Sequence, residues 1–118
     1  MQLSILTRII IIFFMIVHIT QAYTLTVGLS FVSACRVYVT DCNQNILRDA
    51  GKKYCNGNDW HWDEAPGTTY CLHIEPLTEP NSNRYCQVNG GGDACFKVDG
   101  DLAFWGIYKC TGANGKTC

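Results

Sequence analysis

The spacing of apolar residues near the start of the chain is that of a β-strand. Every second residue from Tyr23 to Phe31 is apolar, and the residues between them are Thr, Gly or Ser. A period of two is typical of a strand with one buried face. We therefore predict a strand over this segment, which Arg36 to Thr40 either continue or pair with.

The pattern after Thr40 changes to that of a helix. Asp49 precedes Lys53 by four residues, in the orientation that favours a helical ion pair, and Asp41 or Asn43 can cap the first turn. The apolar residues that share one helical face are Ile46, Leu47, Ala50 and Tyr54. Two lysines stand at the negative end of the helix dipole, before Asn and Gly residues that end it. We predict a short helix that packs on a sheet.

The rest of the chain predicts two strands, a second helix and a hairpin. Residues 59–64 and 68–75 are strands separated by a turn at 65–67. A second helix is expected within 76–88, with Thr78 as cap and Pro80 in the first turn. Residues 94–110 form a hairpin turning at Asp99 and Gly100. The predicted fold class is α+β: a disulfide-stapled sandwich, with two short helices on one face of a mostly antiparallel sheet and a C-terminal β-hairpin.

The first 22 residues have the layout of a secretory signal peptide. Arg8 precedes the apolar run 9–17, and Thr20 and Ala22 suit cleavage after Ala22. This run is too short for a membrane span, which argues against the alternative of an uncleaved anchor. We predict a signal peptide over 1–22 and one secreted, extracellular, cysteine-rich domain over 23–118. That domain would carry eight basic and ten acidic side chains, so it lacks the basic surface typical of nucleic-acid binding.

The cysteines predict a disulfide framework. There are eight of them, and no pair has the CxxC spacing of zinc or redox sites. An even number behind a signal peptide indicates four bridges, although eight cysteines can pair in about a hundred ways. A catalytic thiol would leave one cysteine without a partner, so we interpret Cys55 as a structural cysteine that fastens the first helix. The predicted disulfide residues are Cys35, Cys42, Cys55, Cys71, Cys86, Cys95, Cys110 and Cys118.

One resemblance to a known family covers about Gly28 to Cys95. The run NILRDAGKKYC, followed by fifteen residues to Cys71, fourteen to Cys86 and eight to Cys95, resembles the cysteine frame of small virally encoded fungal killer toxins of the killer-protein-six type. Secreted fungal effectors share their fold. The resemblance implies a β-α-β-β-α-β sandwich held by disulfides, without cofactor or enzymatic site, that acts on other cells from outside. The final hairpin and tail extend beyond the usual end of that family.

A second resemblance lies at the C-terminal end. The stretch GIYKCTGANGKTC is similar to the closing segment of fungal guanyl-specific ribonucleases, some of whose inactive relatives are secreted effectors. In this alignment Cys110 stands where that family has its general-acid histidine, and a bridged cysteine cannot donate that proton. The resemblance implies that any residual activity would need His73 and Glu75 on one strand face, with Arg84 as the phosphate partner.

The segment Trp60–Glu64 offers a weaker candidate site. Two aromatic residues, a histidine and two carboxylates favour a surface contact through Trp60, His61 and Trp62, as a sugar-stacking or a metal-binding patch. Simple alternation is the competing interpretation, in which both tryptophans pack inward and His61 faces solvent. A related alternative is a wall-carbohydrate-binding module that uses Trp60, Trp62 or Trp105.

Taken with the resemblances, the sequence predicts a secreted toxin-like or effector protein of fungal origin that acts through surface contacts. We expect no catalytic residue, no metal and no cofactor. The expected partner is a protein or membrane component of a host or competitor cell rather than a nucleic acid, and the expected state is a monomer. The alternative functions are a degenerate ribonuclease-like, RNA-binding effector and a wall-binding module.

Overall fold

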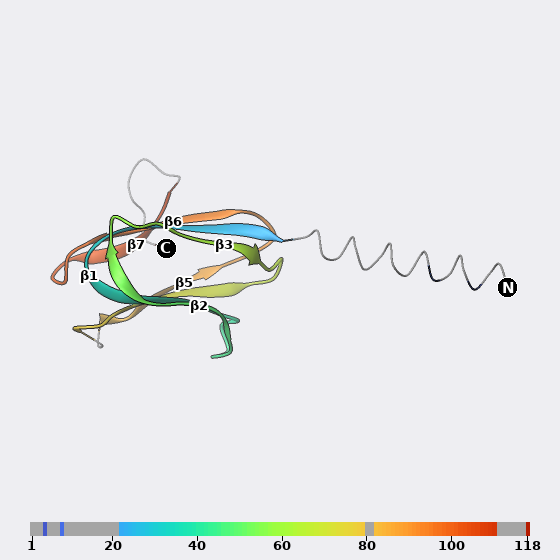
Figure 1. Cartoon of the computed structure of the whole chain (residues 1–118), viewed down its shortest axis with the longest axis horizontal. Coiled ribbons are helices and arrows are strands. Elements are labelled where there is room, and N and C mark those ends of the chain that lie inside the picture. Colours follow the sequence, from blue (N-terminus) through green and yellow to red (C-terminus); the bar gives the residue numbers. More distant parts are fainter. Residues whose placement is uncertain (1–3, 5–7, 9–21, 80–81, 111–117) are drawn as a thin grey trace.

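In the computed structural model the chain folds into one strongly bent β-sheet (Figure 1). The structure describes residues 4, 8, 22–79, 82–110 and 118. The predicted signal peptide lies almost wholly outside these residues and stays a prediction. The strands are β1 (Tyr23–Thr40), β2 (Ile46–Asn56), β3 (Trp60–Ala65), β4 (Tyr70–Pro76), β5 (Arg84–Val88), β6 (Ala94–Gly100) and β7 (Trp105–Lys109).

The sheet is organised around β1. Strands β2 and β3 return antiparallel along one edge of β1, β2 beside its C-terminal half and β3 beside its N-terminal half. Along the other edge, β4 pairs antiparallel with the C-terminal half and β6 pairs parallel with the N-terminal half. Strand β5 extends the sheet from β4, and β7 extends it from β6. The bend of β1 therefore divides the sheet into two facing layers, β3-β1-β6-β7 and β2-β1-β4-β5.

The core lies between these layers because β1 alternates without interruption. Each odd-numbered residue from Leu25 to Val39 is buried, including Phe31 at the bend. The strand over Tyr23–Phe31 is therefore confirmed, and Arg36–Thr40 continue it. Strands β4, β6 and β7 add Leu72, Ile74, Val98 and Ile107 to the same core. Burial of these apolar side chains is the main contribution to the stability of such a domain.

The predicted α+β class is wrong, because residues 22–79 and 82–110 contain no α-helix. The expected helix before Cys55 is β2, which pairs with β1 over its whole length. Its apolar residues Ile46, Leu47 and Tyr54 are exposed rather than packed on a sheet. Backbone pairing with β1 outweighs a weak local preference for helix, as tertiary contacts commonly do.

The expected helix cap at Asp41 is a turn instead. The Asp41 carboxylate accepts hydrogen bonds from the backbone N–H groups of Asn43 and Asn45, at 2.8 and 3.2 Å, and the Asp41 N–H donates to the Asn45 carbonyl at 3.0 Å. Cys42 and Gln44 have positive φ values, which reverse the chain. An Asp side chain satisfies backbone donors in the same way in a turn as at a helix start, so the sequence signal was ambiguous.

The second expected helix is also wrong. Arg84–Val88 form β5, with Cys86 and Val88 buried between exposed residues. Pro80 and Asn81, which would have started the helix, lie outside the described residues. The two strands predicted around residues 65–67 are present as β3 and β4, although each pairs with β1 and not with the other.

The C-terminal hairpin is present, but its turn is displaced. Strand β6 runs through Asp99 to Gly100, and the connection is formed by residues 101–104. The Asp101 carboxylate accepts hydrogen bonds from the backbone N–H groups of Ala103 and Phe104, both at 2.9 Å. Gly100 has φ +122°, and a Cβ atom there would lie 2.6 Å from the Trp105 Cα. Only glycine can adopt this backbone conformation at position 100, directly before the turn.

All eight cysteines form disulfides, as predicted. The bridges are Cys35–Cys55, Cys42–Cys71, Cys86–Cys118 and Cys95–Cys110. Cys55 is a structural cysteine, but it fastens strand β2 to β1 and not a helix to a sheet. Four bridges in a small domain are consistent with a secreted, cysteine-rich protein.

Candidate functional site: an aromatic row on the outer sheet face

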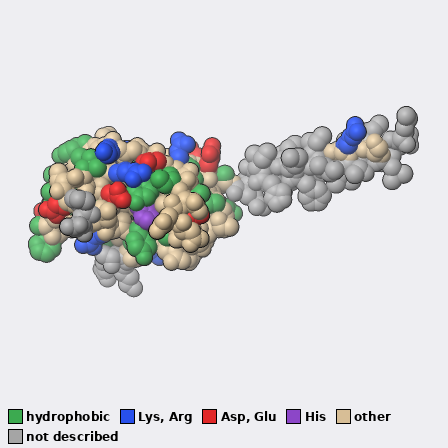
Figure 2. Space-filling view, turned by 90° about the horizontal axis from the view of Figure 1, so that it is seen from below, with side chains coloured by type: hydrophobic (Ala, Val, Ile, Leu, Met, Phe, Trp, Pro, Cys, Tyr) green, Lys and Arg blue, Asp and Glu red, His purple; other side chains and the backbone are tan. Residues whose placement is uncertain are grey.

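The polar side of the layer β2-β1-β4-β5 carries the densest group of interacting side chains. Sheet register places four residues in one line across the strands, because Tyr38 pairs with Asp49 on β2 and with His73 on β4, and His73 pairs with Tyr85 on β5. Side chains directly opposite one another in a sheet lie on the same face. Figure 2 views the molecule from the side of β2 and β5 and shows acidic and basic side chains around a histidine.

Three rings of this line are stacked and are called here the aromatic row: Tyr38, His73 and Tyr85. The rings of Tyr38 and His73 are 4.7 Å apart and inclined by 5°, and those of His73 and Tyr85 are 5.6 Å apart and inclined by 26°. The Arg36 guanidinium lies 4.3 Å from the centre of the Tyr38 ring and closes that end of the row. Tyr85, at the other end, is 64% exposed. The stack fixes the orientation of an exposed tyrosine ring.

Arg36 is held by carboxylates on both neighbouring strands. Its Nη2 lies 2.7 Å from Asp49 Oδ2, and its Nη1 lies 3.8 Å from Glu75 Oε2. The hydrogen bond from Arg36, helped by one from the Gly51 N–H, lowers the pKa of Asp49 below its usual value. Because these side chains are partly exposed, each ion pair contributes little to stability. Their effect is to hold Arg36 in place beside Tyr38.

Tyr38 and Glu75 are joined by a short hydrogen bond. The Tyr38 hydroxyl donates to Glu75 Oε1 at 2.6 Å. Burial, followed by this hydrogen bond, raises the pKa of Tyr38 to about 12. The phenol therefore remains a hydrogen-bond donor at physiological pH.

His73 is hydrogen-bonded to Thr40 on the neighbouring strand. Its Nε2 lies 2.8 Å from the Thr40 Oγ1, which also accepts the Cys42 N–H at 3.2 Å. Burial lowers the pKa of His73, and the nearby Glu75 carboxylate opposes that shift only in part. The imidazole is therefore neutral at pH 7, as suits a ring stacked between two others.

The chemistry of this face suits binding better than reaction. Glu75, Arg36 and the His73 Nε2 already have partners within the site, and Arg36, Asp49 and Glu75 together carry one negative charge. The exposed ring of Tyr85 presents a fixed apolar surface with a polar end, a combination that is enriched at recognition sites.

The structure brings together only part of the constellation that the ribonuclease resemblance implied. His73 and Glu75 do lie on one face of β4, but Arg84 points the other way, with its guanidinium 5.1 Å from the centre of the Trp105 ring. The cation beside Glu75 is Arg36, which sequence reasoning missed. The signal was present, because Arg36, Tyr38 and Thr40 are the polar positions of the same alternation that buries Val37 and Val39.

The surface contact predicted for Trp60, His61 and Trp62 is divided between the two sides of β3. Trp62 is buried, with its ring edge-on to Tyr70 at 5.9 Å, and Trp60 is half-buried against the core. His61 is exposed and hydrogen-bonded to the Thr26 hydroxyl at 3.3 Å. This arrangement matches the competing interpretation, in which the tryptophans pack inward and His61 faces solvent. Trp105, the third tryptophan considered for wall binding, is also buried.

No family model, curated protein or solved structure gives a significant match to this chain. Among the described residues there is no group of three or more His, Cys, Asp or Glu side chains placed to hold a metal ion. In the same part of the chain, no helix has the length and hydrophobicity to cross a membrane. The function is therefore inferred from the site itself.

Proposed function

We propose that this is a secreted toxin-like or effector protein of fungal origin, which acts on other cells from outside by surface contact and without catalysis. The observation that carries this proposal is the aromatic row with its exposed end at Tyr85. Four disulfides support a secreted protein, and the layout of residues 1–22 supports export. The proposed partner is a protein or membrane component of the target cell, and the protein acts as a monomer.

The rigidity of the site supports binding as its role. Each strand of the row carries or adjoins a disulfide: Cys35–Cys55 holds β1, Cys42–Cys71 ties the turn after β1 to β4, and Cys86–Cys118 holds β5. Little side-chain or backbone entropy therefore remains to be lost on binding. Preorganisation of this kind increases affinity by reducing the entropy lost in the complex. Tyrosine is also among the residues that most often dominate the binding energy of an interface.

Replacing Tyr85 by alanine is expected to reduce activity on target cells about tenfold, the loss typical of one interface anchor. The measurement is dye leakage and viability of fungal and plant cells exposed to purified oxidised protein. Tyr54→Ala is the matched control, because Tyr54 is a similarly exposed tyrosine outside the row. Native protein that is reduced and alkylated should be inactive. Equal activity of the two alanine variants would contradict a role for the row.

A degenerate ribonuclease is the second candidate, favoured by the proximity of His73, Glu75 and Arg36 on one face. Phosphoryl transfer needs a base, an acid and a free cation, whereas here Arg36 is held by two carboxylates and Glu75 accepts the Tyr38 hydroxyl. We therefore expect no cleavage when the oxidised protein is incubated with total RNA. Cleavage that disappears in His73→Ala would overturn the proposal of a non-catalytic protein.

A further inference from the structure

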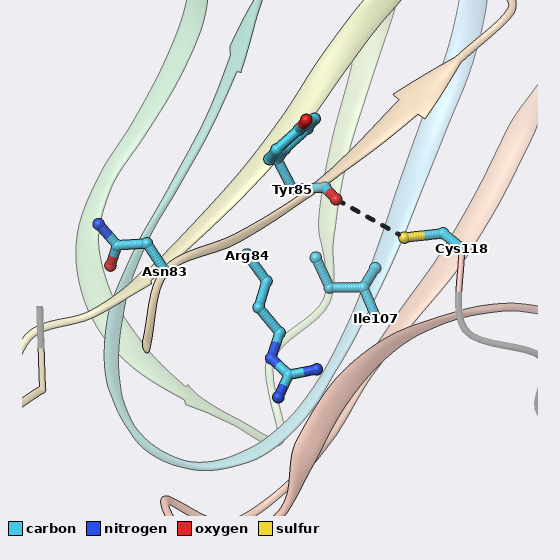
Figure 3. A pocket seen from close by; sticks show the side chains of 5 residues that line it. All are labelled: Asn83, Arg84, Tyr85, Ile107 and Cys118. Atoms are coloured by element: carbon cyan, nitrogen blue, oxygen red, sulfur yellow. Dashed lines mark hydrogen bonds between the residues drawn. The ribbon is translucent and has the colours of Figure 1, made fainter. Parts of the chain in front are cut away.

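The two outermost strands of the sheet, β5 and β7, face each other across a seam. They end the strand order β5-β4-β1-β6-β7, and no backbone ladder joins them. Cys118 crosses this seam, because its N–H donates to the Ile107 carbonyl on β7 at 3.0 Å and its sulfur is bonded to Cys86 on β5. Beside it lies an open hollow of about 260 Å³, lined by Asn83, Arg84, Tyr85, Ile107 and Cys118 (Figure 3).

Arg84 enters this hollow from the face of β5 opposite to the aromatic row. Figure 3 shows the Tyr85 and Arg84 side chains leaving the strand in opposite directions, with Arg84 on the side of β7. The guanidinium lies over the Trp105 ring at 5.1 Å, and that ring packs in turn on Phe31 at 5.0 Å. Trp105 is only 6% exposed, so it is a fixed base for the cation. A guanidinium held over an aromatic face keeps its N–H groups available at its edge.

Arg84 forms an ion pair with none of the ten Asp and Glu side chains of the chain, all of which are among the described residues. Arg36 makes an instructive contrast, since it is stacked on Tyr38 but neutralised by Asp49 and Glu75. Both arginines are stacked on an aromatic ring, but only Arg36 is paired with carboxylate side chains. Arg84 can offer two parallel N–H groups to an external oxyanion, and Arg36 cannot.

We infer that the hollow between β5 and β7 is an anion-binding subsite, in which Arg84 takes the carboxylate or phosphate group of a small acidic ligand. Planar, bidentate recognition of these groups is what the arginine fork does best. Ile107 and Cys118 give the hollow an apolar side, which suits a ligand whose acidic group is attached to a short apolar part. One exposed arginine implies weak binding, with a Kd of about 1 mM.

The test is a titration of the oxidised protein, followed by NMR at the Arg84 Nε–H and the Trp105 indole N–H. Inorganic phosphate and acetate are the probes, and sodium chloride at equal ionic strength is the reference. A saturable shift of both signals with either probe, and not with chloride, is expected. Saturation by acetate alone would identify a carboxylate ligand, and saturation by phosphate alone would identify a phosphate ligand. Shifts that stay linear and match those of chloride would overturn the inference.

Variants separate the subsite from general surface charge. Arg84→Gln should abolish saturation, and Arg84→Lys, which keeps the charge without the fork, should weaken binding at least about fivefold. Arg48→Gln removes another exposed arginine, on β2, and should leave the titration unchanged. Unchanged binding in a folded Arg84→Gln variant would also overturn the inference. Neither outcome depends on the aromatic row, so the inference and the proposed function can fail independently.

Discussion

Replacing Cys35 and Cys55 together by alanine is expected to lower the free energy of unfolding by about 3 to 5 kcal/mol. The bridge joins residues 20 positions apart in sequence, and the chain-entropy model assigns about 3 kcal/mol to a loop of this size. Both cysteines are also 0% exposed, so their removal leaves unfilled space between the two layers. The free-energy cost of this cavity adds to the entropic cost of removing the bridge.

The measurement is equilibrium unfolding in urea, monitored by tryptophan fluorescence. The matched control is the double replacement of Cys95 and Cys110, whose bridge spans 15 residues and whose side chains are exposed. The entropic term is about the same for this loop, but no buried volume is lost. We expect the exposed pair to cost about 1 kcal/mol less than the buried pair. A smaller loss for Cys35 and Cys55 than for the control would refute the role assigned to this bridge in the core.

Phe31→Ala is expected to reduce the free energy of unfolding by about 3 to 5 kcal/mol, the usual effect of deleting a buried phenylalanine. Phe31 is 0% exposed and lies where β1 passes from one layer to the other. Its ring contacts Trp105 at a centroid distance of 5.0 Å. Because β1 is the strand shared by both layers, a cavity at its bend removes packing from each of them.

The neighbouring residue supplies the control for this prediction. Val32 is 57% exposed, and Val32→Ala should change the free energy of unfolding by no more than about 0.5 kcal/mol, as is usual at an exposed site. Urea unfolding of both variants beside the native protein is sufficient. If Phe31→Ala were as mild as Val32→Ala, the bend of β1 would not be a packed part of the core.

The sequence patterns that were interpreted correctly are those of strands in which every second residue is buried. The period of two between Tyr23 and Phe31 survives in β1 because one face of that strand meets the core, and burial is a strong and local constraint on residue type. The hairpin over residues 94–110 was found for the same reason, since Phe96 and Val98 point inward. The turn within it was displaced because Asp101, rather than Asp99, provides the side-chain hydrogen bonds.

The segment Ile46–Asn56 was misread because its surroundings, and not its composition, decide its structure. Three of its four apolar residues at helical spacing are exposed, and Asp49 pairs with Arg36 on β1 rather than with Lys53 four residues later. Neither fact can be read from a single segment. An edge strand with few buried residues gives little periodic signal, so weak helical preferences appear stronger than they are.

The sequence by itself determined the cysteine-rich class of this protein, its four disulfides and the buried face of β1, because each depends on residue type or on neighbouring residues in the chain. The tertiary structure alone decided the disulfide pairing, the strand register, and therefore both candidate sites. Tyr38, His73 and Tyr85 come from three strands and meet only because the register aligns them. Arg84 meets Trp105 because the bend of β1 brings two distant edge strands face to face. Such contacts are long-range, and local sequence patterns do not encode them.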